Sequence, residues 1–199
     1  MNLLQALNEG ARDALIYEII LELKAELLKD EAKKNGKTQA KKAADNILKQ
    51  MKNTGREGGA IIDENGKQII GGVYSAVRLS EALPVEKLPE RTQAPDYTRF
   101  INDAKKNEGE PLPLPSAAEL SAYIKSEKAA HKGARGHKVA WDFGEGLPYV
   151  DAALLLDMLY LLPGTACIPA KKSVYSALYF VTESSDGLMM PMRRPAKCL

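Results

Sequence analysis

Asp151-Ala-Ala-Leu-Leu-Leu-Asp-Met-Leu-Tyr-Leu-Leu162 is the most informative stretch of the sequence for the fold. Its apolar residues cover most of the circumference of a helix, which is typical of a helix buried at the centre of a domain. Asp151 is a suitable N-cap, and Pro163-Gly164 ends the helix. We therefore predict that the rest of the C-terminal part packs around this helix.

The segments on either side of this helix favour β-strands. Val139, Trp141 and Phe143 alternate with smaller or polar residues, as in a strand with one apolar face. After the helix we expect strands at 165–168, 177–181 and 188–193, with a turn at 184–187. Pro191 has no backbone N–H, so the last strand should lie at an edge or leave that position unpaired.

Farther upstream, Ser116-Ala-Ala-Glu119 is a capping box that should begin another helix. Six of the 11 prolines lie between residues 81 and 115, which predicts an extended connector without a core element. Before it, Asn65-Gly66 separates two apolar runs, and this pattern predicts a β-hairpin with a type I′ turn. A third strand is expected at 73–79.

The N-terminal part favours two helices joined by a short connection. Apolar residues recur at helical spacing from Ile16 to Leu27, and the first helix should run from about Glu9 to Lys34 and end at Asn35-Gly36. Thr38 should cap the second helix, and Gly55 should end it. We predict an antiparallel helical hairpin.

Together these elements predict an α+β fold with an N-terminal helical hairpin, a small antiparallel sheet, a proline-rich connector and a helix-on-sheet C-terminal lobe. The predicted domains are 1–57, 58–115 and 116–199. The 199 residues are 45% hydrophobic and 27% charged, with a net charge of +2, which is ordinary for a globular protein. Cys167 and Cys198 form no paired motif, so we expect reduced thiols in a cytoplasmic protein. We also expect no leader peptide and no membrane association.

Basic residues gather in two places. Residues 29–56 contain nine basic residues against three acidic ones, and a second cluster follows the capping-box helix. A phosphate-facing surface would use Lys34, Lys37, Lys41, Lys42, Lys49, Lys52, Lys132, Arg135 and Lys138. The alternative is a solvated helix face, and no aromatic residue lies between Lys29 and Arg56 to stack on a base.

No motif predicts catalysis, a metal site or a cofactor. Gly36-Lys37-Thr38 has Glu31 where a phosphate-binding loop needs glycine. His131 and His137 have no partners at metal-ligand spacing. Asp142 and Glu145 are close in sequence, but nothing places them across a cleft. We therefore expect no enzyme.

Two short motifs stand out in the C-terminal part, Leu155-Leu156-Asp157-Met158-Leu159 and Met190-Pro191-Met192-Arg193. They resemble motifs of the bacterial DNA polymerase III beta subunit, the sliding clamp, and there is weaker similarity at 95–99 and 72–79. The resemblance implies that the C-terminal lobe is clamp-like. It also implies that Met190, Pro191, Met192 and Arg193 form part of a hydrophobic surface for partner peptides. The alternative is that these residues form a core strand.

The chain has room for one clamp-like domain, whereas a clamp protomer has three. The resemblance implies a non-enzymatic, DNA-associated accessory protein of phage or mobile-element origin, with DNA as its partner. The alternative is a phage-encoded inhibitor that binds a host nucleic-acid-processing enzyme, as an anti-CRISPR protein does. A third role is oligomerisation through the N-terminal helices.

Overall fold

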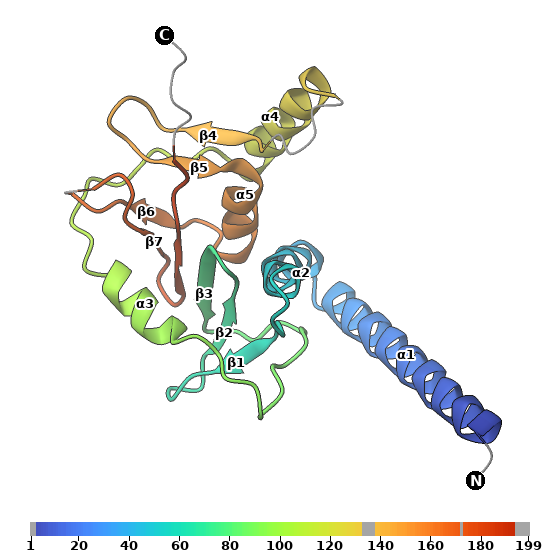
Figure 1. Ribbon diagram of the computed structural model, residues 1–199. Helices are drawn as coiled ribbons and strands as arrows, with labels where there is room; N and C mark the ends of the chain where they lie inside the picture. Colours follow the sequence, from blue (N-terminus) through green and yellow to red (C-terminus); the bar gives the residue numbers. More distant parts are fainter. Residues whose placement is uncertain (1–2, 133–137, 172, 194–199) are drawn as a thin grey trace.

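The computed structural model describes residues 3–132, 138–171 and 173–193, and within them the chain is a mixed α+β protein, as predicted. Figure 1 shows the arrangement of its elements. The helices are α1 (Leu3–Lys34), α2 (Thr38–Asn53), α3 (Tyr97–Ala104), α4 (Ala117–Ala130) and α5 (Ala152–Leu161). The strands are β1 (Ala60–Ile62), β2 (Gln68–Gly71), β3 (Ser75–Leu79), β4 (Ala140–Asp142), β5 (Tyr149–Asp151), β6 (Ala166–Ile168), β7 (Leu178–Val181) and β8 (Asp186–Met189).

The main sheet has two halves of the same design. Its strand order is β1-β2-β3-β8-β7-β6, and every neighbouring pair is antiparallel. In each half, one helix is followed by three sequential strands: α2 by β1–β3 and α5 by β6–β8. The halves meet where β3 pairs with β8. The sheet therefore joins strands that are about 110 positions apart in sequence.

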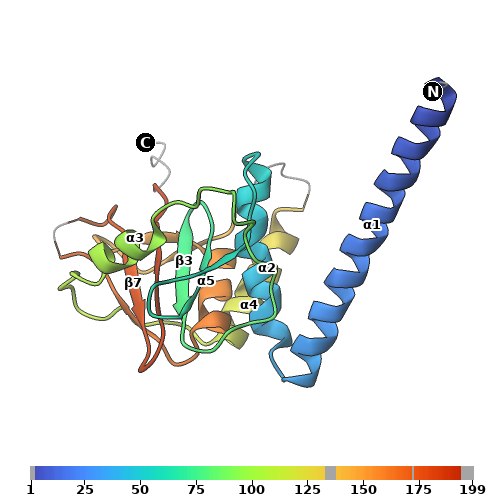
Figure 2. The same cartoon turned by 90° about the horizontal axis from the view of Figure 1, so that it is seen from below.

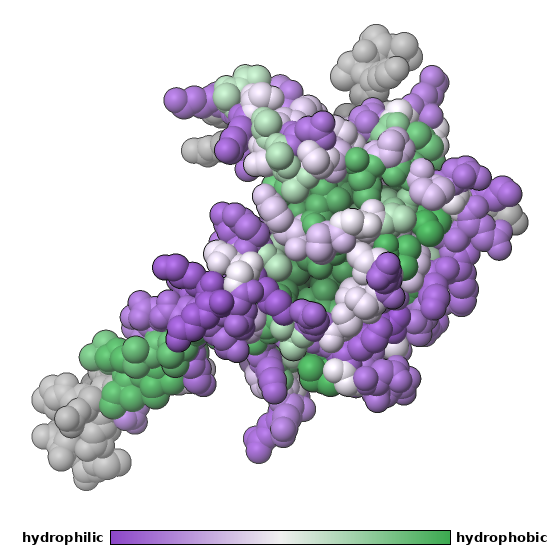
Figure 3. All heavy atoms as spheres, turned by 180° about the vertical axis from the view of Figure 1, so that it is seen from behind, coloured by the Kyte–Doolittle hydropathy of each residue, from purple (hydrophilic) through white to green (hydrophobic). Residues whose placement is uncertain are grey.

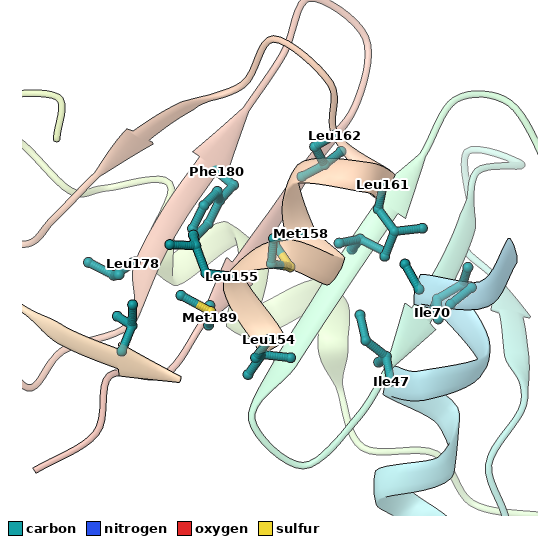
Figure 4. Packing of buried hydrophobic residues seen from close by; sticks show 14 of the residues in the cluster. Ile47, Ile70, Leu154, Leu155, Met158, Leu161, Leu162, Leu178, Phe180 and Met189 are labelled. Carbon is teal, nitrogen blue, oxygen red and sulfur yellow. The ribbon is translucent and has the colours of Figure 1, made fainter. Parts of the chain in front are cut away.

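The sheet is covered on both faces. On one face α2 and α5 pack side by side over the larger core, which contains Ile47, Leu155, Met158, Phe180 and Met189, all fully buried. Figure 4 shows these side chains converging between the two helices and the sheet. On the other face α3 covers a smaller core around Ile101. The buried position of α5 confirms the prediction made from its apolar sequence.

A buried ion pair fixes the junction of the two halves. Arg78 of β3 lies opposite Asp186 of β8 and donates two hydrogen bonds to its carboxylate, of 2.9 and 2.7 Å. The Tyr179 hydroxyl donates a third, of 3.1 Å, to the same carboxylate. Burial, reinforced by the negative charge of Asp186, raises the pKa of Tyr179 to about 12, so this hydroxyl keeps its proton. Donors from two strands therefore satisfy the buried carboxylate.

Several local predictions are confirmed. Ser116 and Glu119 form the capping box of α4, and the Asp151 carboxylate accepts hydrogen bonds from the amides of Ala153 and Leu154 at the start of α5. The hairpin of β1 and β2 forms, but its predicted type I′ turn is wrong. Among the described residues no non-glycine residue has a positive φ. Asp63 instead accepts from the amides of Asn65 and Lys67, so only Gly66 takes a left-handed conformation in this turn.

Other local predictions are wrong. Helix α3 interrupts the proline-rich connector, where no helix was expected. The predicted last strand at 188–193 is shifted: β8 is Asp186–Met189, in the middle of the sheet, and Pro191 lies beyond its end. Thr38 is the first residue of α2, whose N-cap is Lys37, with no side-chain cap bond.

The two N-terminal helices do join through a short turn at Gly36, but they diverge from it. Figure 2 shows α1 extending away from the body of the protein. Only Leu28 and Ala32, near the turn, are shielded from solvent among the described side chains of α1. The apolar residues of α2 are buried in the larger core, so its exposed side is polar and offers α1 no apolar surface.

We predict that Asp186→Ala lowers the free energy of unfolding by about 3 kcal/mol, because it leaves the Arg78 guanidinium buried without its counter-ion. Urea unfolding followed by circular dichroism measures the change. The matched control is Asp103→Ala, which removes an exposed pair with Lys106 and should lower the free energy of unfolding far less. Equal destabilisation by the two variants would contradict the importance of the buried pair.

Candidate functional site

A groove with apolar walls lies between α3, the turn that joins β2 to β3, and the residue that follows β8. Its volume is about 710 Å³, which is within the range of protein ligand sites. Four large apolar side chains at its surface are between 39% and 52% exposed: Val73, Tyr74, Phe100 and Met190. Large apolar side chains gathered at one place mark a candidate binding surface.

Helix α3 supplies one wall. The Asp96 carboxylate accepts from the Arg99 amide at 2.9 Å and so caps the first turn. The helical repeat then places Tyr97, Ile101 and Ala104 against the sheet. Phe100, on an adjacent face of the helix, stays about half exposed and lines the groove.

The β2–β3 turn and the segment after β8 supply the opposite wall. The Gly72 amide donates to the Ser75 carbonyl at 2.8 Å, which closes the turn and leaves Val73 and Tyr74 at its tip. The Met190 amide donates to the Tyr74 carbonyl at 2.7 Å. This bond holds Met190 beside Tyr74, although the two residues come from opposite halves of the sheet.

Tyr97 joins the two walls. Its ring lies directly against Gly71, where an added Cβ would be 2.2 Å from ring carbons. Its hydroxyl lies 3.4 Å from the Gly72 carbonyl and 3.6 Å from the Met51 sulfur. Burial raises the pKa of Tyr97, so the hydroxyl remains a neutral donor. Gly71 therefore permits the close packing that fixes α3 on the turn.

The groove has positive charge at its rim. Arg56 lines it, and the Lys138 ammonium lies 5.7 Å from the centre of the Tyr74 ring. Asp103 is the one carboxylate among the described residues that line the groove. It accepts a 2.7 Å hydrogen bond from Lys106, which lowers the pKa of Asp103.

The four residues of the Met-Pro-Met-Arg motif do not share one surface. Met190 lines the groove, whereas the Met192 amide donates to the Tyr149 carbonyl at the start of β5. Pro191 is partly buried, and Arg193 is exposed.

Of the residues that line this groove, the sequence interpretation named only Met190 and missed, among others, the large side chains of Val73, Tyr74, Tyr97 and Phe100. Two local signals could have indicated them. One is the Gly71-Gly72 pair before two large residues, and the other is the helix-capping Asp96 after Pro95. Neither signal indicates that residues 71–74 and helix α3 are neighbours in the folded chain.

The predicted basic residues are spread over several environments. Lys37 pairs with Glu81 at 2.9 Å, Lys41 is buried against Asp45 at 2.6 Å, and Lys52 pairs with Glu86 at 3.4 Å. Lys34, Lys42 and Lys49 are exposed and form no salt bridge within the described parts of the chain. Lys132 follows α4, Lys138 precedes β4, and Arg135 lies outside the described residues.

A carboxylate also lies next to this basic helix. Asp157 of α5 accepts a 3.0 Å hydrogen bond from the Asn46 amide group of α2. Burial between the helices raises the pKa of Asp157 to about 7, although Asn46 and Lys42 act in the opposite direction. The surface shared by α2 and α5 therefore changes charge near neutral pH.

We predict that Asp157→Asn stabilises the protein above pH 7. The Asp157 carboxyl binds its proton more tightly in the folded than in the unfolded chain, so its contribution to stability falls as pH rises from about 4 to about 7. The variant should lose that part of the pH dependence of stability. Its free energy of unfolding at pH 8 should exceed that of the wild type by about 1–2 kcal/mol. Urea unfolding from pH 5 to 8 measures this, with the exposed Glu90→Gln as control. A pH-independent difference between Asp157→Asn and the wild type would contradict it.

No protein-family model, curated protein or solved structure matches the chain. Among the described residues, no three metal-binding side chains of histidine, cysteine, aspartate or glutamate gather at one place. In the same part of the chain, no helix combines the length and the apolar character that crossing a membrane requires.

Proposed function

We propose that the protein is a non-enzymatic binding protein that takes an apolar segment of a partner protein into the groove beside α3. The observation that supports this best is the exposure of Val73, Tyr74, Phe100 and Met190 around one groove. Water contact with these side chains is unfavourable, and a partner would remove it. The groove contains aromatic and methionine side chains, which are frequent in interface cores and adapt to different ligands.

The charge at the rim selects among apolar segments. Arg56 and Lys138 favour a segment with aspartate or glutamate beside its apolar residues. The lining also offers Tyr74, whose exposed ring can pack against an inserted side chain. We infer a short peptide segment with at least two apolar anchors and an adjacent carboxylate.

For the partner itself we propose a nucleic-acid-processing protein. In one form the chain is a clamp-like accessory protein, and the resemblance at Met190–Arg193 agrees with the position of Met190 in the groove. Alternatively, the chain is a phage-encoded inhibitor that binds a host nucleic-acid-processing enzyme, as an anti-CRISPR protein does. Loss of target cleavage when the purified protein is added to a CRISPR nuclease would favour the inhibitor over the clamp-like accessory protein.

Selection of peptides from a random display library on the immobilised protein tests the groove. Enriched peptides should combine apolar and acidic residues. Fluorescence anisotropy with one such peptide should show at least about tenfold weaker binding to Phe100→Ala and to Met190→Ala.

Ile62→Ala is the matched control, because Ile62 is 54% exposed on β1 and does not line the groove. It should bind the selected peptide as the wild type does. Near-ultraviolet circular dichroism checks that each variant keeps its packing. Equal affinity of all variants for the peptide would contradict binding in the groove.

A second candidate function is DNA association through α2. Lys42 and Lys49, seven residues apart, lie on its exposed side. Binding of a short DNA duplex should weaken steeply between about 50 and 200 mM salt. The double variant Lys42→Ala/Lys49→Ala should reduce the affinity, and it should lower the salt slope by about one unit for each lysine that binds a phosphate. The control is Lys106→Ala, beside the end of α3. Absence of binding at low salt would exclude this role.

A further inference from the structure

A second cavity lies beside the groove, on the side where α2 ends. Its volume is about 260 Å³. The two cavities share four lining residues, which are Met51, Arg56, Pro95 and Tyr97. They are therefore adjacent, and a peptide segment that fills the groove can continue into the second cavity.

The second cavity differs from the groove in its lining. Arg56, Glu57, Thr92 and Gln93 contribute polar side chains to it. None of the four exposed apolar residues of the groove is among the described residues that line it. Glu57 is already engaged, because its carboxylate accepts a hydrogen bond from the Thr92 hydroxyl. The groove thus suits the apolar part of a segment, and the second cavity suits a polar side chain of the same segment.

Arg56 is the only cationic residue among the described residues that line either cavity. It is exposed and forms no salt bridge within the described parts of the chain. Burial raises the pKa of Tyr97, and the positive charge of Arg56 acts in the opposite direction, so the guanidinium lies near the Tyr97 hydroxyl. Arg56 therefore stands at the border of the two cavities with its donors open to a ligand.

Other charged groups near the groove have partners. The Lys138 ammonium lies over the Tyr74 ring, and Lys138 lines neither cavity. The Asp103 carboxylate accepts a hydrogen bond from Lys106. Arg56 thus carries the positive charge that a ligand in either cavity meets first.

Helix α1 takes no part in either cavity. Figure 3 shows apolar side chains on the part of α1 that extends from the body, but none of the described residues of α1 lines the groove or the second cavity. Recognition of a segment in the two cavities therefore depends on the body of the protein.

A carboxylate fits the second cavity better than a phosphate group does. The planar guanidinium of Arg56 can bind the two oxygens of a carboxylate in a bidentate arrangement. A phosphate monoester carries nearly two negative charges. The Glu57 carboxylate, which lines the same cavity, repels two negative charges more strongly than one.

We propose that the second cavity is the specificity subsite of the groove, in which Arg56 binds the side-chain carboxylate of an aspartate or glutamate of the partner segment. This inference rests on the proposed function, since the apolar anchors of the same segment occupy the groove beside Phe100 and Met190. It assigns the selectivity for the acidic residue to Arg56 and not to Lys138. It also places the acidic residue on the side of the anchors that is nearest the end of α2.

A double-mutant cycle between protein and peptide tests the subsite. The probes are one acidic peptide selected from the display library, made with an amidated C-terminus, and the same peptide with its acidic residue replaced by the corresponding amide. In fluorescence anisotropy the wild type should bind the acidic peptide about tenfold more tightly than the amide peptide. Arg56→Gln should bind the acidic peptide about tenfold more weakly than the wild type does and the amide peptide equally well, so the preference disappears.

Lys138→Gln and the matched control Arg91→Gln should keep the preference for the acidic peptide. Arg91 is exposed and lines neither cavity. A preference that persists in Arg56→Gln, or that disappears in Lys138→Gln, overturns the inference. So does a wild type that binds both peptides equally, and so does a selection that returns only peptides without a carboxylate side chain.

Phe100→Ala separates a failure of the subsite from a failure of the groove. It should weaken the binding of both peptides by the same factor and keep the preference for the acidic one. If Phe100→Ala weakens both peptides but Arg56→Gln affects the two alike, the groove stands and the subsite is wrong. If Phe100→Ala changes neither affinity, or the library yields no binding peptide, the proposed function and the subsite are both wrong.

Discussion

The pairing of β3 with β8 determines how the other elements are placed. It joins two helix-and-three-strand halves into one sheet, and it brings α2 and α5 side by side on the same face. The Arg78–Asp186 pair specifies its register, because a shift of β3 by one residue would move Arg78 to the opposite, apolar face and away from Asp186. Tyr179 adds a donor to the same carboxylate. One buried polar cluster thus selects a single alignment of two distant segments.

The groove follows from this alignment. With β3 and β8 adjacent, the tip of the β2–β3 turn and the end of β8 lie together, and the bond from Met190 to Tyr74 joins them. The long connector returns across the face opposite α2 and α5, where α3 packs through Ile101 and Tyr97. Because α3 is only eight residues long, it leaves the end of the central strands open. The candidate site is thus the uncovered end of the smaller core.

Helix α1 is organised differently. Apart from its last turns, its described side chains make little contact with the domain, so its conformation depends on its own helix propensity and on whatever covers its apolar side. A solitary helix of this length with eight exposed large apolar residues is unfavourable in water. Helix α1 and the groove are therefore separate parts of the chain.

Local signals in the sequence were enough to predict the buried helix at 152–161, the cap at Asp151, the capping box at Ser116 and the hairpin around Gly66. These elements depend on neighbouring residues, so periodicity and turn chemistry suffice to find them. Only the folded chain shows which strands form the centre of the sheet, that α1 diverges from α2, and where the groove lies. Ser75–Leu79 and Asp186–Met189 become neighbours across more than a hundred residues, and no local pattern indicates such a pairing. For the same reason Met190 was identified from the sequence, whereas Tyr74, Tyr97 and Phe100 were recognised only where the tertiary structure places them around it.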